Sequence, residues 1–384
     1  MSCRALTLAG LAARYKTRAM IPCQDLLLAT LGRAAPGSLL QTGIRSFSRH
    51  LVGGYPYVVK LDLTDACNLR CRMCYAPNRG RELPLPRILS ILEQIGDVPV
   101  RLDLLGGEPL LRGDIPEIIR FARSRTGIGK TVLYTNATLA TEGLARRLYR
   151  AGLDRAIVTL ISHDPEKHDR FSGKPGSWQE TMTGIRNLVN AGIKTYTFTA
   201  IHSENVGHIS EIRHLVQKGL GITPLFYQYV PQSAHDPLMI SRELWHEVKH
   251  AILSCWSPEH FRYIARILTF CGRICLGGYY VISVKIDGSV TPCPFIDDIC
   301  LGKVFDDTIW DIFARRYRSA EFCEFMTLPQ ACRSCSYKDL CGGGCRAGNR
   351  VLFGSYAERD CRCLGPWSEP VLSSMLFDRL PTFF

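Results

Sequence analysis

Short apolar segments alternate with segments of helical periodicity between residues 57 and 230. Six segments rich in β-branched and aromatic residues are predicted as strands, namely 57–63, 100–105, 131–136, 155–161, 194–201 and 223–230. Between them, apolar residues recur at helical spacing in 86–96, 115–125, 141–151, 177–191 and 206–219. Strands that alternate with helices form parallel sheets, so the pattern predicts an α/β fold, a partial (β/α)6 TIM-like barrel.

This alternation stops after Pro231. Residues 241–255 and 258–270 carry helical spacing, and the chain beyond residue 271 is rich in cysteine. A chain of 384 residues exceeds one typical domain. The sequence therefore predicts four segments, namely a basic N-terminal extension (1–54), a core barrel (55–232), a helical bridge (233–270) and a Cys-rich C-terminal domain (271–384).

The first fifty residues are basic and almost free of acids. They carry seven Lys or Arg and the single acid Asp25, within a chain of formal net charge +12. Such a segment is typical of an organelle transit peptide, of an arm that docks an acidic partner, or of a solvated extension. Its basic residues are not interleaved with aromatic side chains, so nucleic acid is not an expected partner. The chain has no run of eighteen apolar residues, and no membrane span is expected.

The 17 cysteines are unevenly distributed. Residues 75–254 contain none, whereas eleven lie between Cys271 and Cys363. Secreted disulfide scaffolds are short and spread their cysteines evenly. The clustering therefore predicts metal sites, and a cytoplasmic location in which the thiols stay reduced.

Three thiols, Cys67, Cys71 and Cys74, follow the first predicted strand with the spacing C-x3-C-x2-C. Three thiols can hold one iron-sulfur cube and leave its fourth iron without a protein ligand. Zinc is the alternative, but zinc takes four ligands and the next histidine in the chain is His163. The spacing resembles that of the radical S-adenosylmethionine (radical SAM) superfamily. This resemblance implies a [4Fe-4S] cluster whose open iron binds the amino and carboxylate groups of SAM.

A glycine-rich turn, Gly106-Gly107-Glu108-Pro109, ends the second predicted strand. Glycines let a backbone approach a ligand closely, and strand ends are where barrels of this kind bind ligands. The turn lies one strand-helix unit after the three cysteines, and in that place it resembles the GGEP motif of radical SAM enzymes. The resemblance implies that these four residues hold the SAM amino group.

The family also places polar side chains at the ends of later strands, against the carboxylate and ribose of SAM. The resemblance implies such roles for Asn136 and Ser162. The residue before the third cysteine is usually aromatic and packs near adenine, but here it is Met73, with Tyr75 just beyond the cysteine. Tyr75 is therefore a further candidate for cofactor binding, and Met can fill the same apolar contact as an aromatic ring.

The last third of the chain has an ordered cysteine pattern. Gly288 and then Cys293 follow Cys275, and the remaining members are Cys332-x2-Cys335-x5-Cys341-x3-Cys345 and the pair Cys361 and Cys363. The order resembles the SPASM extension of radical SAM enzymes, which implies two auxiliary [4Fe-4S] clusters rather than a zinc ribbon.

The resemblance also implies how the thiols are shared. One auxiliary cluster would take Cys275, Cys293 and Cys345, with Cys271 as the upstream candidate, and the other would take Cys332, Cys335, Cys341 and a terminal cysteine. The usual ending D-P-x-C aligns Cys363 with the ligand and Cys361 with the proline. The six other thiols are expected to be incidental, namely Cys3, Cys23, Cys255, Cys300, Cys323 and Cys361.

Together these resemblances imply an oxidoreductase-type radical SAM enzyme that forms a 5'-deoxyadenosyl radical and takes hydrogen from a substrate. A peptide or protein undergoing maturation is the first expected substrate, and a tetrapyrrole or other small-molecule cofactor precursor is the alternative. An electron donor such as flavodoxin or ferredoxin and a separate peptide carrier are the implied partners. An iron-sulfur scaffold for electron transfer or binding is the non-enzyme alternative, although the three cysteines and Glu108 are all present.

Overall fold

Six parallel strands in chain order form the central sheet of the computed structural model. The structure describes residues 56, 58–76, 78–96, 100–245, 247, 275, 277–278, 281–335, 338 and 342–363. The six strands are β1 (Val58–Asp62), β2 (Val100–Leu105), β3 (Ile128–Thr135), β4 (Arg155–Thr159), β5 (Lys194–Ile201) and β6 (Thr223–Gln228). Each pairs in parallel with the next along the chain. This confirms the predicted α/β fold with an open barrel of six strands.

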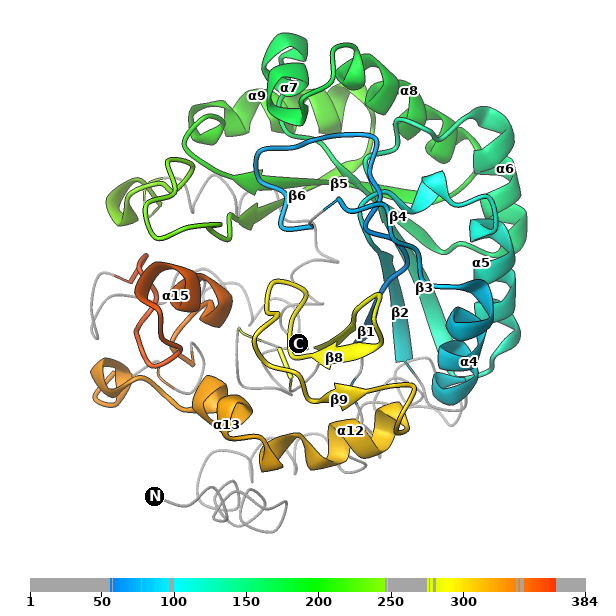
Figure 1. The fold of residues 1–384 in the computed structure, drawn as a ribbon. Helices are drawn as coiled ribbons and strands as arrows, with labels where there is room; N and C mark the ends of the chain where they lie inside the picture. Colours follow the sequence, from blue (N-terminus) through cyan, green and yellow to red (C-terminus); the bar gives the residue numbers. More distant parts are fainter. Residues whose placement is uncertain are drawn as a thin grey trace, which may run out of the picture.

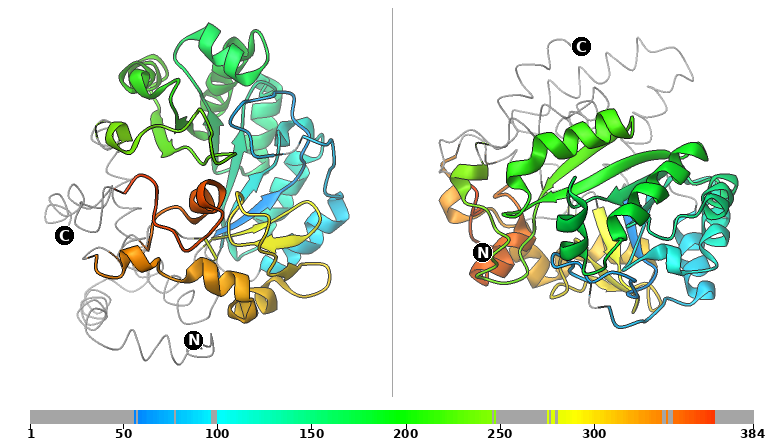
Figure 2. Two further views of the ribbon diagram at one scale, coloured as in Figure 1. Left: turned by 60° about the vertical axis from the view of Figure 1, so that its left-hand side comes forward. Right: turned by 90° about the horizontal axis from the view of Figure 1, so that it is seen from above.

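The connecting helices all lie on the outer face of the curved sheet (Figures 1 and 2). They are α4 (Leu85–Ile95), α5 (Ile115–Ser124), α6 (Glu142–Ala151), α7 (Pro165–Ser172), α8 (Ser177–Asn190) and α9 (Ile209–His214). Strand residues of one parity, such as Leu61, Leu102 and Leu133, are fully buried beneath these helices in the main core. Residues of the other parity therefore face the inside of the barrel.

The helix boundaries mostly follow local sequence signals. At the N-terminus of α6, the Thr141 hydroxyl accepts from Leu144 N, and Gly152 ends the helix at a φ of 96°. The predicted helix 206–219 is instead three pieces, namely a 3-10 turn η3 (Val206–His208), α9 and a π-helix η4 (Leu215–Gly219). Helix α7 was not predicted, because most of its eight residues are polar.

The C-terminal part of the chain continues the same sheet. Strand β7 (Val281–Val284) pairs in parallel with β1, and β8 (Ser289–Thr291) and β9 (Gly302–Lys303) follow as antiparallel strands. The turn between β7 and β8 contains Gly288, the glycine of the cysteine pattern, at a φ of 81°. Because β7 joins β1 directly, the two parts of the chain share one sheet of nine strands.

The described residues of the C-terminal part include the short helices α12 (Ile309–Arg315), α13 (Ala320–Met326) and α15 (Arg346–Phe353). They lie across the side of the barrel that the six parallel strands leave open (Figure 1). Gln94 of α4 fixes this arrangement, since its side chain accepts from Ile309 N at 3.1 Å and its carbonyl accepts from the Trp310 indole at 2.8 Å.

The four predicted segments remain a prediction. The N-terminal extension and most of the predicted helical bridge, including 248–270, lie outside the described residues. Within the described part of the chain, no helix combines the length and apolarity that a membrane crossing requires.

Candidate active site

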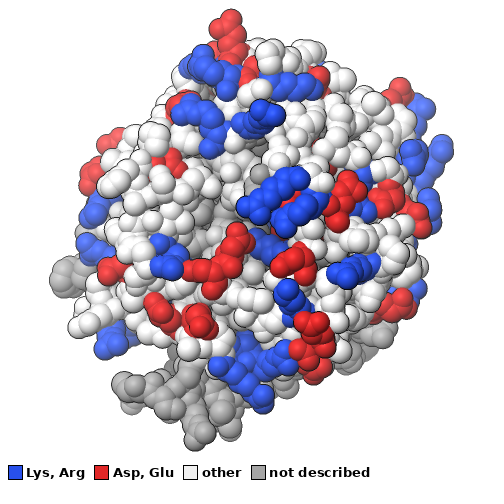
Figure 3. Space-filling view, viewed as in Figure 1, with Lys and Arg blue, Asp and Glu red and all other residues white. Residues whose placement is uncertain are grey.

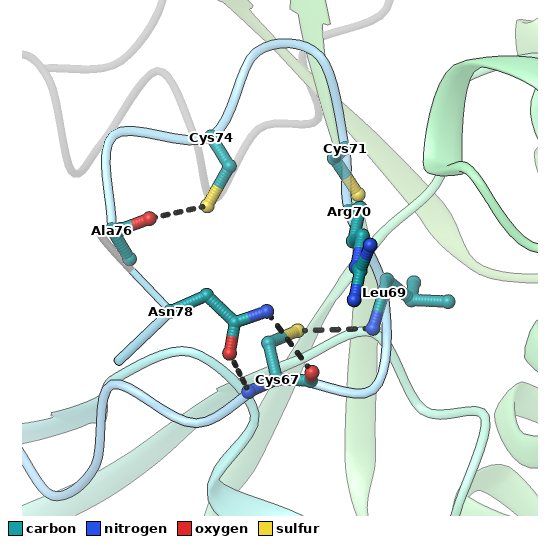
Figure 4. Close-up of a pocket in the computed structure, with 7 residues that line it drawn as sticks. All are labelled: Cys67, Leu69, Arg70, Cys71, Cys74, Ala76 and Asn78. Atoms are coloured by element: carbon teal, nitrogen blue, oxygen red, sulfur yellow. Dashed lines mark hydrogen bonds between the residues drawn. The ribbon is translucent and has the colours of Figure 1, made fainter. Parts of the chain in front are cut away.

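The loop after β1 forms a ring around a pocket of about 320 Å³. The sulfur atoms of Cys67, Cys71 and Cys74 all turn into this ring (Figure 4). The other residues that line the pocket are Leu69, Arg70, Ala76 and Asn78, which add no thiol, imidazole or carboxylate. Three thiols and no fourth ligand suit an iron-sulfur cube with one open iron.

The ring is held by backbone hydrogen bonds to helix α7. Arg70 N donates to Ser172 O at 2.8 Å, and Arg72 N donates to Phe171 O at 3.1 Å. Across the ring, Asn78 accepts from Cys67 N at 3.0 Å and donates to Cys67 O at 3.3 Å. The end of the unpredicted helix thus supports the loop that carries the predicted ligands.

The three thiols are in an environment that opposes negative charge. Burial raises the pKa of Cys71 to about 12, and burial also raises the pKa of Cys67 and of Cys74. Thiols bind metals as thiolates, so a cationic group in the ring would be needed to hold them in that form. In the part of the chain that the structure describes, no three His, Cys, Asp or Glu side chains converge on a single metal ion.

The glycine turn at the end of β2 packs directly against the segment that leads into the ring. Gly107 N donates to Thr64 O at 2.7 Å, and Glu108 N donates to Ala66 O at 2.8 Å. Gly106 has a φ of 152° and a Cβ on Gly107 would overlap the carbonyl of Ala66. Only a residue without a side chain permits this approach at Gly107.

Gly107→Ala is therefore expected to separate the two loops and to weaken SAM binding at least roughly tenfold, because the added methyl group meets rigid backbone. Gly113→Ala is the matched control, since a Cβ there meets nothing within 4 Å. Equilibrium binding of SAM to both reconstituted variants measures the difference. Equal affinity of the two variants would show that the close approach at Gly107 has no role in the site.

Glu108 joins the ends of β2 and β3. Its fully buried carboxylate accepts from Thr135 Oγ1 at 2.7 Å, from Leu110 N at 2.9 Å and from Asn136 N at 2.7 Å. Pro109 begins the 3-10 turn η2 (Pro109–Leu111) that follows it. The carboxylate thus positions the loop, and its predicted contact with the SAM amino group stays a prediction.

Burial raises the pKa of Glu108 from 4.5 to about 7, although its three hydrogen bonds oppose this shift. Between pH 4.5 and 7 the folded state therefore binds more protons than the unfolded state. The free energy of unfolding should fall as the pH rises through this range. The shift corresponds to about 3 kcal/mol. Glu108→Gln is expected to remove this part of the pH dependence, while Asp62, whose pKa burial raises to about 6, retains its own. The urea midpoints of unfolding are measured at pH 5 and pH 7.5 for the wild-type protein and for Glu108→Gln. The same change of midpoint with pH in both proteins would contradict the prediction.

Two other predicted cofactor residues, Asn136 and Ser162, lie in different places: Asn136 beside the ring and Ser162 in a second pocket. Asn136 donates to Asn68 Oδ1 at 3.0 Å and lies 3.9 Å from the Cys67 sulfur, so it belongs to the same site. Ser162 lines a second pocket of about 350 Å³ that also includes Arg72 and Arg170. Their roles toward SAM stay predictions.

Tyr75 faces the C-terminal part of the chain. Its ring centroid lies 4.6 Å from that of Phe295, and Lys285 Nζ lies 5.8 Å from the Tyr75 centroid. It lines neither of the two pockets described above. Met73 instead packs on a small cluster that includes Ile161 and Phe171.

Sequence reasoning missed Arg112. This buried side chain donates to Leu63 O at 3.2 Å and to Leu83 O at 2.9 Å, and it pairs with Asp114 at 2.7 Å. It thereby fixes the end of β1 from which the cysteine ring departs. Nothing in the local pattern distinguishes it from a surface arginine, because its partners are backbone carbonyls remote in sequence.

The C-terminal thiols fall into two groups. Burial raises the pKa of Cys293 to about 12, and the nearby thiols Cys275 and Cys345 add to this shift. Cys332 has Cys363 and Cys335 as its thiol neighbours. The predicted sharing of these thiols between two clusters stays a prediction. Two further predicted ligands, Cys271 and Cys341, lie outside the described residues.

The pair Cys361 and Cys363 separates in space. The Cys361 thiol has Cys345 among its neighbours, whereas Cys363 lies with Cys332. The alignment of Cys363 with the terminal ligand therefore remains the preferred prediction. Cys323, expected to be an incidental thiol, is disulfide-bonded.

Asp360 and Arg362, which are next to Cys361 and Cys363 in the sequence, form a buried ion pair. Arg362 donates to the Asp360 carboxylate from Nε at 2.8 Å and from Nη2 at 2.6 Å. Asp360 also accepts from Cys345 N at 2.7 Å, and Arg362 together with this backbone bond holds its pKa below the usual value despite burial. The pair thus connects the segment that carries Cys361 and Cys363 to the loop that carries Cys345.

Comparison with known families identifies the class of protein. The model of the radical SAM superfamily matches residues 61–216, and the model of the SPASM iron-sulfur cluster-binding domain matches residues 275–336. The chain is therefore a radical SAM enzyme of the SPASM type, a class that uses SAM and [4Fe-4S] clusters.

Relatives match over both parts of the chain. It is 27% identical to the AdoMet-dependent heme synthase of Oleidesulfovibrio alaskensis, over 84% of this chain and 91% of that protein. It is 25% identical to the PqqA peptide cyclase of Granulibacter bethesdensis, over 80% of this chain and 87% of that protein. The structure of Streptococcus suis SuiB bound to SAM has a TM-score of 0.65 and 18% identity, covering 90% of this chain and 88% of SuiB.

Proposed function

We propose that Cys67, Cys71 and Cys74 hold the [4Fe-4S] cluster that binds SAM, and that the turn Gly106 to Pro109 receives the SAM amino group. When bound and reduced, this cluster supplies the cleavage of SAM to methionine and a 5'-deoxyadenosyl radical that takes hydrogen from a substrate carbon. The observation that supports the proposal is the ring of three inward-facing sulfur atoms (Figure 4), with Gly106 and Gly107 packed so closely against the segment leading into it that a Cβ on either would overlap backbone.

The chain's own residues orient SAM and exclude water. Glu108 keeps the glycine turn fixed to the end of β3, and Arg112 fixes the end of β1. The C-terminal part lies over the open side of the barrel, which would shield a reactive radical from solvent (Figure 2). Its thiols would hold auxiliary clusters that exchange electrons with the substrate or with a donor such as flavodoxin or ferredoxin.

A tetrapyrrole is the substrate class proposed here. The AdoMet-dependent heme synthase of Oleidesulfovibrio alaskensis matches the barrel and the C-terminal part with 27% identity over 84% of this chain, against 25% over 80% for the PqqA peptide cyclase of Granulibacter bethesdensis. Small planar substrates require no peptide carrier. We infer that this chain modifies a side chain of a tetrapyrrole cofactor precursor.

A peptide is the second candidate, because the PqqA peptide cyclase matches over a similar share of the chain. SuiB, which shares the fold, has also been solved with its precursor peptide SuiA. A peptide substrate would bring with it a separate carrier protein, as the sequence predicts.

Turnover with the two substrate classes tests the proposal. The reconstituted, reduced chain is incubated with SAM and either coproporphyrin III or a precursor-type peptide, and 5'-deoxyadenosine and substrate mass are measured. The tetrapyrrole proposal predicts that the porphyrin accelerates 5'-deoxyadenosine formation and changes mass. A mass change confined to the peptide would replace it with the second candidate.

A further inference from the structure

Lys60 is a cation on the inside of the barrel whose ammonium donates no hydrogen bond to a described residue. Lys60 lies on β1 between the core residues Val59 and Leu61, so its side chain faces the inner side of the sheet. Its Nζ lies 3.8 Å from Asp103 Oδ2, beyond hydrogen-bonding distance, and the Lys60 side chain is 20% exposed.

Asp103 is already paired with another residue. Arg101 donates to Asp103 Oδ1 from Nε at 2.6 Å and to Oδ2 from Nη2 at 3.0 Å, in the two-pronged geometry that binds a carboxylate most strongly. The Asp103 side chain is 1% exposed, so solvent does not loosen this pair. The three N–H donors of Lys60 are therefore available for another anion.

Aromatic rings lie on the same inner face as Lys60. Its ammonium lies 5.1 Å from the centroid of the Tyr134 ring. Further along the face, the Phe198 and Tyr227 rings stack at 4.8 Å with an angle of 21° between their planes. Tyr227 is 48% exposed although it lies on a strand of the barrel. The half-buried rings of Tyr134 and Phe198 and the exposed ring of Tyr227 share this face with a cation, which suits a flat apolar ligand that carries a negative group.

The position of Lys60 suits a substrate held between the two parts of the chain. β7 pairs with β1 so that Lys60 aligns with Ser283, and Cys293 is close enough for the Lys60 charge to act on its thiol. Ser283 Oγ and Asp62 Oδ1, on the same face, are buried without hydrogen-bond partners among the described residues. Orphaned polar atoms of this kind are uncommon in folded proteins, and a ligand carboxylate would accept a hydrogen bond from the Ser283 hydroxyl.

We propose that Lys60 anchors a substrate carboxylate while the ring wall of Tyr134, Phe198 and Tyr227 receives a flat aromatic body, so that the site takes a planar substrate with carboxylate side chains. This inference rests on the proposed tetrapyrrole function and adds the residue that orients the substrate. An acidic peptide shares the carboxylate but lacks the extended flat surface.

Porphyrin binding without turnover tests this inference. Coproporphyrin III, which carries four carboxylates, and its tetramethyl ester are titrated into the reconstituted, unreduced full chain without SAM, with porphyrin fluorescence as the readout. Lys60→Met should weaken coproporphyrin III binding roughly 10-fold or more, because a charge-assisted contact is lost. Lys60→Arg should largely restore it, and the wild-type protein should bind the ester as weakly as Lys60→Met binds the acid.

Lys303→Met is the matched control, because Lys303 is an exposed lysine on β9. It should bind as the wild-type protein does, and circular dichroism establishes that each variant is folded. The inference is overturned by equal binding of acid and ester, by unchanged binding in Lys60→Met, or by Lys60-dependent binding of a glutamate peptide but not of porphyrin. The titration uses neither SAM nor reductant. A failure of SAM cleavage would therefore contradict the proposed function without affecting the interpretation of porphyrin binding.

Discussion

Cys71→Ala is expected to abolish 5'-deoxyadenosine formation and to lower the iron content from about twelve to about eight per chain. The reason is that the ring supplies only three thiols, and two thiols cannot hold a four-iron cube. Because the auxiliary thiols lie in the separate C-terminal part, their iron should remain. Iron analysis and product detection after anaerobic reconstitution measure both effects.

Cys300→Ala is the control for this result. Cys300 is an exposed thiol that belongs to neither predicted C-terminal group. Its loss should leave iron and 5'-deoxyadenosine unchanged. A Cys71→Ala protein that retains full iron and product formation would show that the ring is not the cluster site.

Asp360→Asn is expected to have the largest effect on stability. The substitution leaves Arg362 buried without its carboxylate, and removing one partner of a buried pair costs about 3–5 kcal/mol. It also weakens the hydrogen bond from Cys345 N to this side chain. The unfolding transition should move to lower urea concentration, and the iron of the auxiliary clusters should be lost before that of the ring.

The exposed pair between Asp307 and Arg315 provides the comparison. Asp307→Asn should leave the urea midpoint unchanged, because water replaces its partner. The replacement of both Asp360 and Arg362 by uncharged residues should recover part of the lost stability, since no unpaired charge then remains. An Asp360→Asn protein as stable as the Asp307→Asn protein would contradict the account of the buried pair.

The sequence predicted the barrel well where burial dominates. β2 and β5 match their predicted bounds, because nearly all of their residues are buried and both strands are rich in β-branched, aromatic or other apolar residues. β3 begins three residues earlier than predicted, because Ile128 is buried by pairing with Val100. That contact depends on the neighbouring strand and leaves no local signal.

The site was predicted in part. The spacing of Cys67, Cys71 and Cys74 and the glycine turn were apparent in the chain, since ligands on one loop must be close in sequence. The roles of Arg112 and Lys60 were not apparent, because their importance comes from partners contributed by other strands. The orientation of Glu108 was also missed. The sequence is the same whether this glutamate is buried and supports the loop or is exposed and binds a ligand.

Charge was the least informative property of the sequence. The basic N-terminal extension left a transit peptide, a docking arm and a solvated extension open, and it carries half of the net charge outside the described residues. On the face viewed in Figure 3, acidic and basic side chains are interspersed. The cation that matters for the substrate proposal, Lys60, lies inside the barrel, where overall composition gives no indication of it.

Formation of 5'-deoxyadenosine from SAM by the reconstituted, dithionite-reduced wild-type chain is the most direct test of the central claim. The account predicts 5'-deoxyadenosine and methionine in equal amounts, dependent on reductant and absent in Cys71→Ala. A wild-type chain that binds about twelve irons and still forms no 5'-deoxyadenosine would contradict it.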